Sequence, residues 1–217
     1  MFQTIAILAF LVTLAGIVVH WLVRPVGAEA RSGCVMRGAV QVFSLLLIEQ
    51  RLSLLGALKK LCYLVAALSF LILGFTGFYP LLAKGEHLSG YLMMIHATFA
   101  PIFALCLAIL ALTWASRFRF AHDDCPCVQR LLRRVTRLRI SAPEGPCRWA
   151  VVGQKTAFWA VMLLSLPLIL SIVLSMLHLF GTHWQEILMA THRWTALVFG
   201  VAVILLTYWT IRIRMAE

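Results

Sequence analysis

Charged residues are scarce in this chain: Asp, Glu, Lys and Arg make up only 12% of its 217 residues, whereas 62% of the residues are hydrophobic. The mean hydropathy is +0.94. Apolar runs reach the length of about 20 residues that crosses about 30 Å of hydrocarbon. Little length is left beyond such spans and two connectors, and no nucleotide-binding motif is present. We therefore expect an all-α integral membrane protein without a soluble catalytic domain or catalytic residues in these 217 residues.

Five transmembrane helices account for the apolar runs, and they are predicted at residues 3–23, 61–83, 88–115, 155–179 and 187–211. The first run lacks the basic start and the cleavage site of a secretory signal, so we expect it to be retained as a helix. The segment 38–58 is also apolar, but Glu49, Gln50 and Arg51 would lie at the bilayer centre of a sixth span. We expect a helix in the membrane interface or against a partner, or an amphipathic linker.

Two segments of the chain look like copies of one hairpin. Each reads lysine, apolar helix, polar turn and a second helix that contains a histidine, once from KKLCYLVAAL to YLMMIHATFA and once from QKTAFWAVML to EILMATHRWTA. The predicted fold is a four-helix bundle of two repeated hairpins plus an N-terminal helix. The expected segments are the N-terminal helix (1–24), an interfacial segment (25–58), the first hairpin (59–116), a basic connector (117–154) and the second hairpin (155–217).

Most basic residues follow the first span, fill the long connector or close the chain, whereas the other side carries little more than Lys84. By the positive-inside rule, the basic segments are cytoplasmic and the N-terminus lies outside. The net charge of +11 is therefore explained by topology, and we expect lipid and protein partners but no nucleic acid. The run RLLRRVTRLR in the connector predicts a short amphipathic helix that could dock an acidic soluble subunit.

His96 and His192 occupy matching places in the two hairpins, each about nine or ten residues beyond its turn. Two imidazoles at one depth on separate helices suit the two axial positions of a haem iron. His178 lies about five residues from its turn and is therefore shallower at 1.5 Å per residue, which makes it the second choice as partner of His96. We predict one b-type haem held by His96 and His192.

Arg193 follows His192 inside the last span, where an unpaired guanidinium is costly. A haem propionate would be a fitting partner, because arginine offers a planar fork of donors to a carboxylate. The alternative is that Arg193 extends to the outer headgroups. We predict Arg193 as a cofactor-binding residue.

The stretches LSFLILGFTGFYPLL and SMLHLFGTHWQEILMATHRWTALVF resemble the cytochrome b subunits of formate dehydrogenase, thiosulfate reductase and nickel–iron hydrogenase. They also resemble the cytochrome-b-like subunit of complexes that contain periplasmic multihaem cytochromes and cytoplasmic iron–sulfur proteins. The similarity covers most of residues 59–212. It implies an electron-transfer subunit of a bacterial inner-membrane complex, with a multihaem cytochrome c, an iron–sulfur protein and other membrane subunits as partners, and with quinone as a further ligand.

The sequence departs from this family where each hairpin begins. Members often carry a haem-ligating His-Trp there, but this chain has Cys62 in one hairpin and Phe158 in the other. On the inner side His20 is the one histidine within a span, so a second haem would need His122, Cys62 or a neighbouring subunit. We therefore expect one haem.

Six cysteines occur without a CxxCH motif, so covalent c-type haem attachment is not indicated. The four on the cytoplasmic side are interpreted as surface thiols in preference to a zinc or iron–sulfur site, and they are Cys34, Cys125, Cys127 and Cys147. Residues at the outer turns could serve a quinone or be ordinary interfacial caps, and they are Glu86, His87, His183 and Glu186.

Two other functions compete with electron transfer. A haem-free anchor of such a complex would keep the histidines as structural residues. A transporter is disfavoured, because transporters often contain inverted repeats, whereas both predicted hairpins run from inside to outside and back.

Overall fold

The computed structural model describes residues 1–24, 54–85, 87–121, 124, 148–177 and 181–216. Throughout these ranges the regular structure is helical. The elements are α1 (Phe2–Val23), α3 (Leu54–Tyr79), a π-helical turn η2 (Pro80–Lys84), α4 (Gly90–Trp114), α6 (Trp149–Met176) and α7 (Thr182–Ala216). Five helices in the described part of the chain are long and apolar enough to cross a membrane. Length and composition thus confirm the predicted transmembrane helices.

Several helix ends differ from the ends of the apolar runs that predict them: α4 (Gly90–Trp114) is shorter than the predicted 88–115, whereas α6 and α7 are longer than predicted. The helix α6 begins at Trp149 instead of residue 155, and α7 covers Thr182–Ala216 instead of 187–211. Hydropathy detects only the apolar part of a helix, which can lie in the hydrocarbon layer. The backbone hydrogen bonds of the helix can continue through polar residues beyond that part. Of the segment predicted at 38–58, residues 38–53 lie outside the described residues, and the remainder from Leu54 is the start of α3 instead of a separate interfacial segment. The amphipathic helix predicted in the basic connector lies outside the described residues.

Hydroxyl side chains within the helices bond to their own backbone. The Thr13 hydroxyl donates to the Ala9 carbonyl at 2.7 Å, and the Ser165 hydroxyl donates to the Met162 carbonyl at 2.7 Å. Because hydrocarbon offers no water, a hydroxyl that is satisfied within its own helix costs little to place there. These polar residues are therefore compatible with membrane spans.

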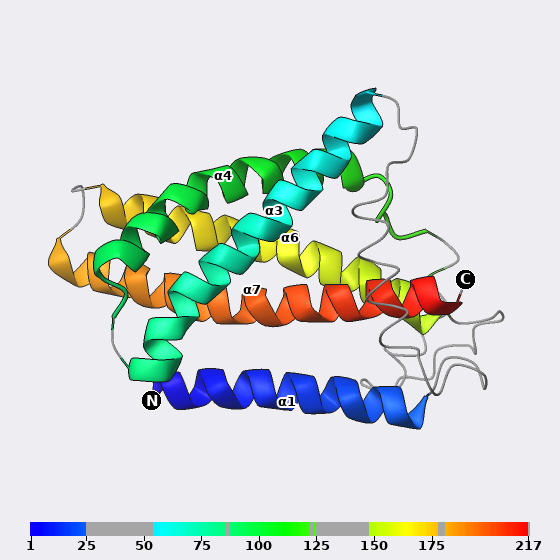
Figure 1. The fold of residues 1–217 in the computed structure, drawn as a ribbon, viewed down its shortest axis with the longest axis horizontal. Helices are drawn as coiled ribbons and strands as arrows, with labels where there is room; N and C mark the ends of the chain where they lie inside the picture. The colour runs from blue at the N-terminus through cyan, green and yellow to red at the C-terminus, as the bar shows by residue number, and fades with distance from the viewer. Residues whose placement is uncertain (25–53, 86, 122–123, 125–147, 178–180, 217) are drawn as a thin grey trace, which may run out of the picture.

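The helices pair as neighbours in the chain (Figure 1). The helix α4 packs along α3, and α7 packs along α6, while smaller contacts join α1 to α7 and α4 to α6. Figure 1 shows α3 crossing diagonally over α6 and α7, with α1 beside α7 at the edge of the molecule. We call the end where α3 turns into α4 and α6 into α7 the turn end. The opposite end, where α1 and α7 finish, is the basic end.

A cluster of apolar side chains joins the two helix pairs midway along their length. Phe103 and Leu107 of α4 pack with Val161 of α6 and with Phe199 and Ala202 of α7. The rings of Phe103 and Phe199 meet edge to face, with centroids 6.0 Å apart. The histidines of α4 and α7 lie on the turn-end side of this cluster in the sequence of each helix.

Pro80 interrupts the α-helical hydrogen-bond pattern of α3 at the turn end. Pro80 has no N–H to donate, and the chain continues as the π-helical turn η2. Gly85 ends this turn with φ 69°, a left-handed conformation that glycine adopts without steric cost. This reversal returns the chain to α4 and brings His96 back alongside the last turns of α3.

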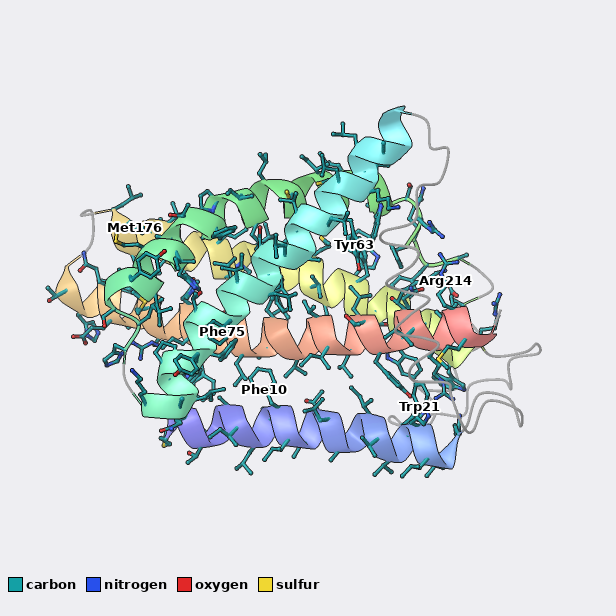
Figure 2. The ribbon with its side chains drawn as sticks, viewed as in Figure 1. Phe10, Trp21, Tyr63, Phe75, Met176 and Arg214 are labelled. Atoms are coloured by element: carbon teal, nitrogen blue, oxygen red, sulfur yellow. The ribbon has the colours of Figure 1, made fainter. Side chains whose placement is uncertain are left out.

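The N-terminal helix α1 is attached mainly at its two ends. Phe2 meets Trp194 edge to face, and the Gln3 amide donates to the Leu82 carbonyl at 3.1 Å. Midway, Phe10 points from α1 toward the other helices in Figure 2 and touches Phe78. Ala6 is the buried side chain on this helix. Most of the remaining surface of α1 is exposed apolar side chain that suits lipid.

The residues after α4 fold back onto α6 at the basic end. Phe118 stacks on Phe158 with ring centroids 4.3 Å apart, and Asp124 forms an ion pair of 2.6 Å with Lys155. Burial alone would raise the pKa of the Asp124 carboxyl, but hydrogen bonds from Lys155 and the Ala121 backbone hold the pKa below its usual range. Phe158 is 1% exposed and fills the core.

Candidate functional site: a pair of oriented histidines

His96 is held against α3 by a hydrogen bond. Its Nδ1 lies 2.9 Å from the hydroxyl oxygen of Thr76, a residue that is 2% exposed. The Thr76 hydroxyl has one hydrogen, and its oxygen lies 2.8 Å from the Ile72 carbonyl and 3.3 Å from the Leu73 carbonyl of its own helix. With that hydrogen donated to the Ile72 carbonyl, the Thr76 oxygen accepts from His96, and the imidazole hydrogen is then on Nδ1.

A glycine makes room for the His96 ring. A Cβ at Gly77 would lie 3.2 Å from Cε1 of His96, which is closer than ordinary van der Waals contact, whereas a Cβ at Gly74 would meet nothing within 4 Å. Thr76 and Gly77 form the Thr-Gly pair of the LGFTGF stretch. The structure thus gives these residues a joint role in fixing the imidazole.

His192 is oriented in the same way by the other helix pair. Its Nδ1 lies 3.0 Å from the Leu168 carbonyl oxygen of α6. A carbonyl can only accept, so the hydrogen of this imidazole also lies on Nδ1. Leu168 follows Pro167 within α6, and the position of its carbonyl sets the direction of the ring.

The two imidazoles share a state that suits metal ligation. With the hydrogen on Nδ1, each neutral ring keeps a lone pair on Nε2, and a backbone or hydroxyl oxygen on Nδ1–H is the usual support of a ligating histidine. The described residues provide no hydrogen-bond partner to either Nε2. His96 belongs to α4 and His192 to α7, and both lie on the turn-end side of the apolar cluster around Phe103 and Phe199.

The described residues offer a donor set of two histidines. Within the described ranges, no group of three or more His, Cys, Asp or Glu side chains is placed to hold a metal ion. A bare ion such as zinc needs three or four protein ligands, whereas a haem iron takes four nitrogens from its macrocycle and needs two axial ligands. The residues present therefore fit a haem better than an isolated metal ion.

Arg193 lies next to this pair at the turn end. Its guanidinium donates to Nδ1 of His87 at 2.8 Å, in a solvent-exposed contact between α7 and the segment before α4. His87 therefore carries its hydrogen on Nε2. The two side chains bring hydrogen-bond donors to one place, one residue along the chain from His192, as a carboxylate ligand would require.

The other turn-end candidates are less well placed or outside the described residues. His183 is exposed in the first turn of α7, and its nearest aromatic partner is its neighbour Trp184, with centroids 6.5 Å apart. His178 and Glu86 belong to the residues that the structure does not describe. The second choice of ligand, His178, therefore stays a prediction.

His20 lies at the basic end in a separate cluster with Tyr208 and Arg212. Sequence reasoning singled out His20 as unpaired because it considered histidine partners and not hydroxyl or guanidinium groups. The Tyr208 hydroxyl and the Arg212 guanidinium both face Nδ1 of His20. The spacing of Tyr208 and Arg212, one helical turn apart on α7, is the signal that could have identified them.

Comparisons with protein-family models, with curated proteins and with solved structures found no match to this chain. The resemblance to cytochrome b subunits rests on the stretches quoted above. The geometry of the two histidines is therefore the main indication of function.

Proposed function

We propose that this chain is a b-type haem electron-transfer subunit of a bacterial inner-membrane redox complex. The observation that carries this proposal is the shared state of His96 and His192, each with Nδ1–H bonded to an oxygen and with Nε2 left as a lone-pair donor. Two such donors on different helices are what axial ligation requires. The bound haem would supply reversible one-electron chemistry.

The residues around the pair have distinct tasks in this proposal. His96 and His192 bind the iron, and the Thr76 hydroxyl and the Leu168 carbonyl orient the two rings. Arg193, together with His87, offers donors to a propionate at the turn end. The four helices α3, α4, α6 and α7 form the proposed bundle of two repeated hairpins. The apolar cluster around Phe103 and Phe199 packs these helices together midway along their length.

In this proposal, electron transfer takes place near one face of the membrane. The distribution of basic residues puts the basic end in the cytoplasm and the N-terminus in the periplasm. One haem near the turn end then exchanges electrons with a periplasmic cytochrome c, an iron–sulfur subunit or a quinone. The chain supplies a redox relay, and the complex supplies the substrate chemistry.

A haem-free membrane anchor is the second candidate. It is favoured by the fact that each histidine already bonds within its own helix pair, His96 to α3 and His192 to α6. Hydrogen bonds of this kind join transmembrane helices without any cofactor. The anchor explains the Nδ1 contacts but gives no reason why both Nε2 atoms have no hydrogen-bond partner among the described residues.

The spectrum of the purified protein tests the proposal. We expect about one b haem per chain by the pyridine haemochrome assay, and we expect His96→Ala and His192→Ala each to abolish the b-type spectrum. His183→Ala is the matched control, because this exposed histidine lies on the same helix as His192. A folded wild-type protein that neither contains nor takes up haem would overturn the proposal and favour the anchor.

A matched pair of glycine variants separates the two candidates in a second way. Gly77→Ala presses on the His96 ring, whereas Gly74→Ala on the same helix meets open space. If His96 binds haem, Gly77→Ala alters the absorption spectrum and Gly74→Ala does not. If His96 is structural, both variants have the same spectroscopic properties as the parent protein.

A further inference from the structure

The basic end contains a cluster of cationic and aromatic side chains that the proposed electron transfer does not use. Arg212 of α7 donates to the Tyr208 hydroxyl at 3.0 Å and to the Arg24 carbonyl at 2.8 Å. The same guanidinium lies 3.3 Å from Nδ1 of His20. These contacts join the last turns of α1 and α7.

The direction of the hydrogen bonds fixes the state of His20. Arginine can only donate, and both Arg212 and the Tyr208 hydroxyl face Nδ1 of His20, so this nitrogen is an acceptor. The hydrogen of the neutral imidazole therefore lies on Nε2. His20 presents an N–H donor, and the guanidinium of Arg212 has further N–H groups beyond the three that bond to Tyr208, His20 and the Arg24 carbonyl.

The cluster carries positive charge that the described residues do not neutralise. The charges of Arg212 and Arg24 both act on His20. Asp124 and Glu186 are the carboxylates in the described part of the chain. Asp124 is paired with Lys155, and Glu186 lies near the start of α7 at the turn end. Within the described ranges, Arg212 and Arg24 therefore lack an acidic partner.

The surroundings of the cluster resemble the boundary between hydrocarbon and headgroups. Trp209 lies 5.5 Å from His20 and Trp21 lies 6.4 Å from Tyr208, measured between ring centroids. Tryptophan and tyrosine are enriched at this depth because their rings are apolar and carry a polar group. Figure 2 shows Trp21 on α1 close to the last turns of α7. The neighbouring Leu22 is 73% exposed and offers an apolar surface for an acyl chain.

We propose that His20, Tyr208 and Arg212 form a binding site for the phosphate of an anionic phospholipid between the ends of α1 and α7. Arginine is suited to phosphate oxygens because its planar donors can bind two of them at once. Basic sites between transmembrane helices on the cytoplasmic side bind anionic lipid headgroups in this way. The headgroup would neutralise Arg212 while its acyl chains cover the exposed side of α1.

The test measures lipid binding to the purified full chain in detergent by native mass spectrometry and by thermal unfolding. Phosphatidylglycerol is the anionic probe, phosphatidylcholine is the zwitterionic probe, and inorganic phosphate is the probe without acyl chains. We expect phosphatidylglycerol to bind the wild-type protein in preference to phosphatidylcholine. At tenfold excess over its dissociation constant it should raise the Tm by about 3–6 °C.

Arg212→Gln should weaken phosphatidylglycerol binding by about tenfold or more, because it removes a charged hydrogen-bond donor. Arg119→Gln is the matched control: Arg119 is an exposed arginine at the same end, and its substitution should leave the affinity unchanged. If Arg212→Gln does not give a monodisperse protein, Tyr208→Phe replaces it. That variant keeps the ring but loses the hydroxyl that holds Arg212, so the affinity should fall about threefold or more.

Three results would overturn the proposal. The first is equal binding of phosphatidylglycerol and phosphatidylcholine, as expected if an acidic side chain outside the described residues already pairs with Arg212. The second is an affinity that both variants leave unchanged, or that Arg119→Gln lowers as much as they do. The third is stabilisation by inorganic phosphate equal to that by the lipid. The haem spectrum is a separate readout, so failure here does not affect the proposed electron transfer.

Discussion

The two ends of the molecule use histidine in opposite states. At the turn end, His96 and His192 donate through Nδ1 to oxygen atoms and keep a lone pair on Nε2. At the basic end, His20 accepts through Nδ1 from donors and keeps a hydrogen on Nε2. A lone pair suits a metal ion, whereas an N–H suits an anion. The neighbouring groups therefore separate three intramembrane histidines into two chemical roles.

The largest expected effect is the difference in haem content between histidine-to-alanine substitutions at the two ends. His192→Ala should remove the b-type spectrum, because the iron loses an axial ligand. His20→Ala should retain about one haem per chain, since His20 presents a hydrogen where a ligand needs a lone pair. Haem quantification of both variants checks this. Loss of haem in His20→Ala would show that the basic end also ligates iron.

The second prediction concerns the support of His96. Thr76→Val keeps the shape of the side chain but removes the oxygen that accepts from Nδ1. Loss of such a supporting contact typically lowers the affinity for a ligated metal by about 10-fold to 100-fold, and we expect haem retention to fall at the low end of this range.

Thr98→Val is the control for that measurement, because the Thr98 hydroxyl is exposed and donates to the Met94 carbonyl of its own helix. Haem titration of the apoprotein gives both affinities. Equal affinities for Thr76→Val and Thr98→Val would show that the Thr76 hydroxyl does not orient the ligand.

The third prediction disturbs the basic end without touching the turn end. A Cβ at Gly153 would lie 2.6 Å from Cε2 of Trp209, so Gly153→Ala must push this ring away from α6. Overpacking of this kind costs about 1–3 kcal/mol. Gly16→Ala meets no atom within 4 Å and is the control. Thermal unfolding should show a lower Tm for Gly153→Ala alone, and its haem spectrum should stay that of the wild type.

The smallest expected effect concerns the ion pair of Asp124 and Lys155. Because the folded state lowers the pKa of Asp124, the pair stabilises the protein above the unfolded pKa of about 3.9, and this contribution is lost as the pH falls through that value toward the folded pKa. Asp124→Asn should cost on the order of 1 kcal/mol near neutral pH. Unfolding measured from pH 7 down to pH 3 should show the two proteins converge, and a constant difference would contradict this assignment.

The transmembrane helices could be predicted from the sequence because hydropathy depends on composition alone. Their ends could not, since the helix α7 begins at Thr182, before its apolar run, and continues through Arg212 after that run has stopped. Matching positions in the two hairpin segments predicted His96 and His192 as candidate ligands, but their contacts with Thr76 and with the Leu168 carbonyl depend on which helix faces which. The same reason hid Tyr208, whose partner His20 lies 188 positions away in the chain.

That separation has a consequence for how the protein is made. The contacts of α1 with α7 join the first and last helices, and the Arg212 guanidinium that binds the Arg24 carbonyl belongs to the last turns of the chain. A ribosome completes α1 long before α7 exists, so α1 enters the bilayer without its polar partners. Docking of α1 is therefore a late step of biogenesis, and a ribosome that stops before Tyr208 leaves the first helix inserted but unattached.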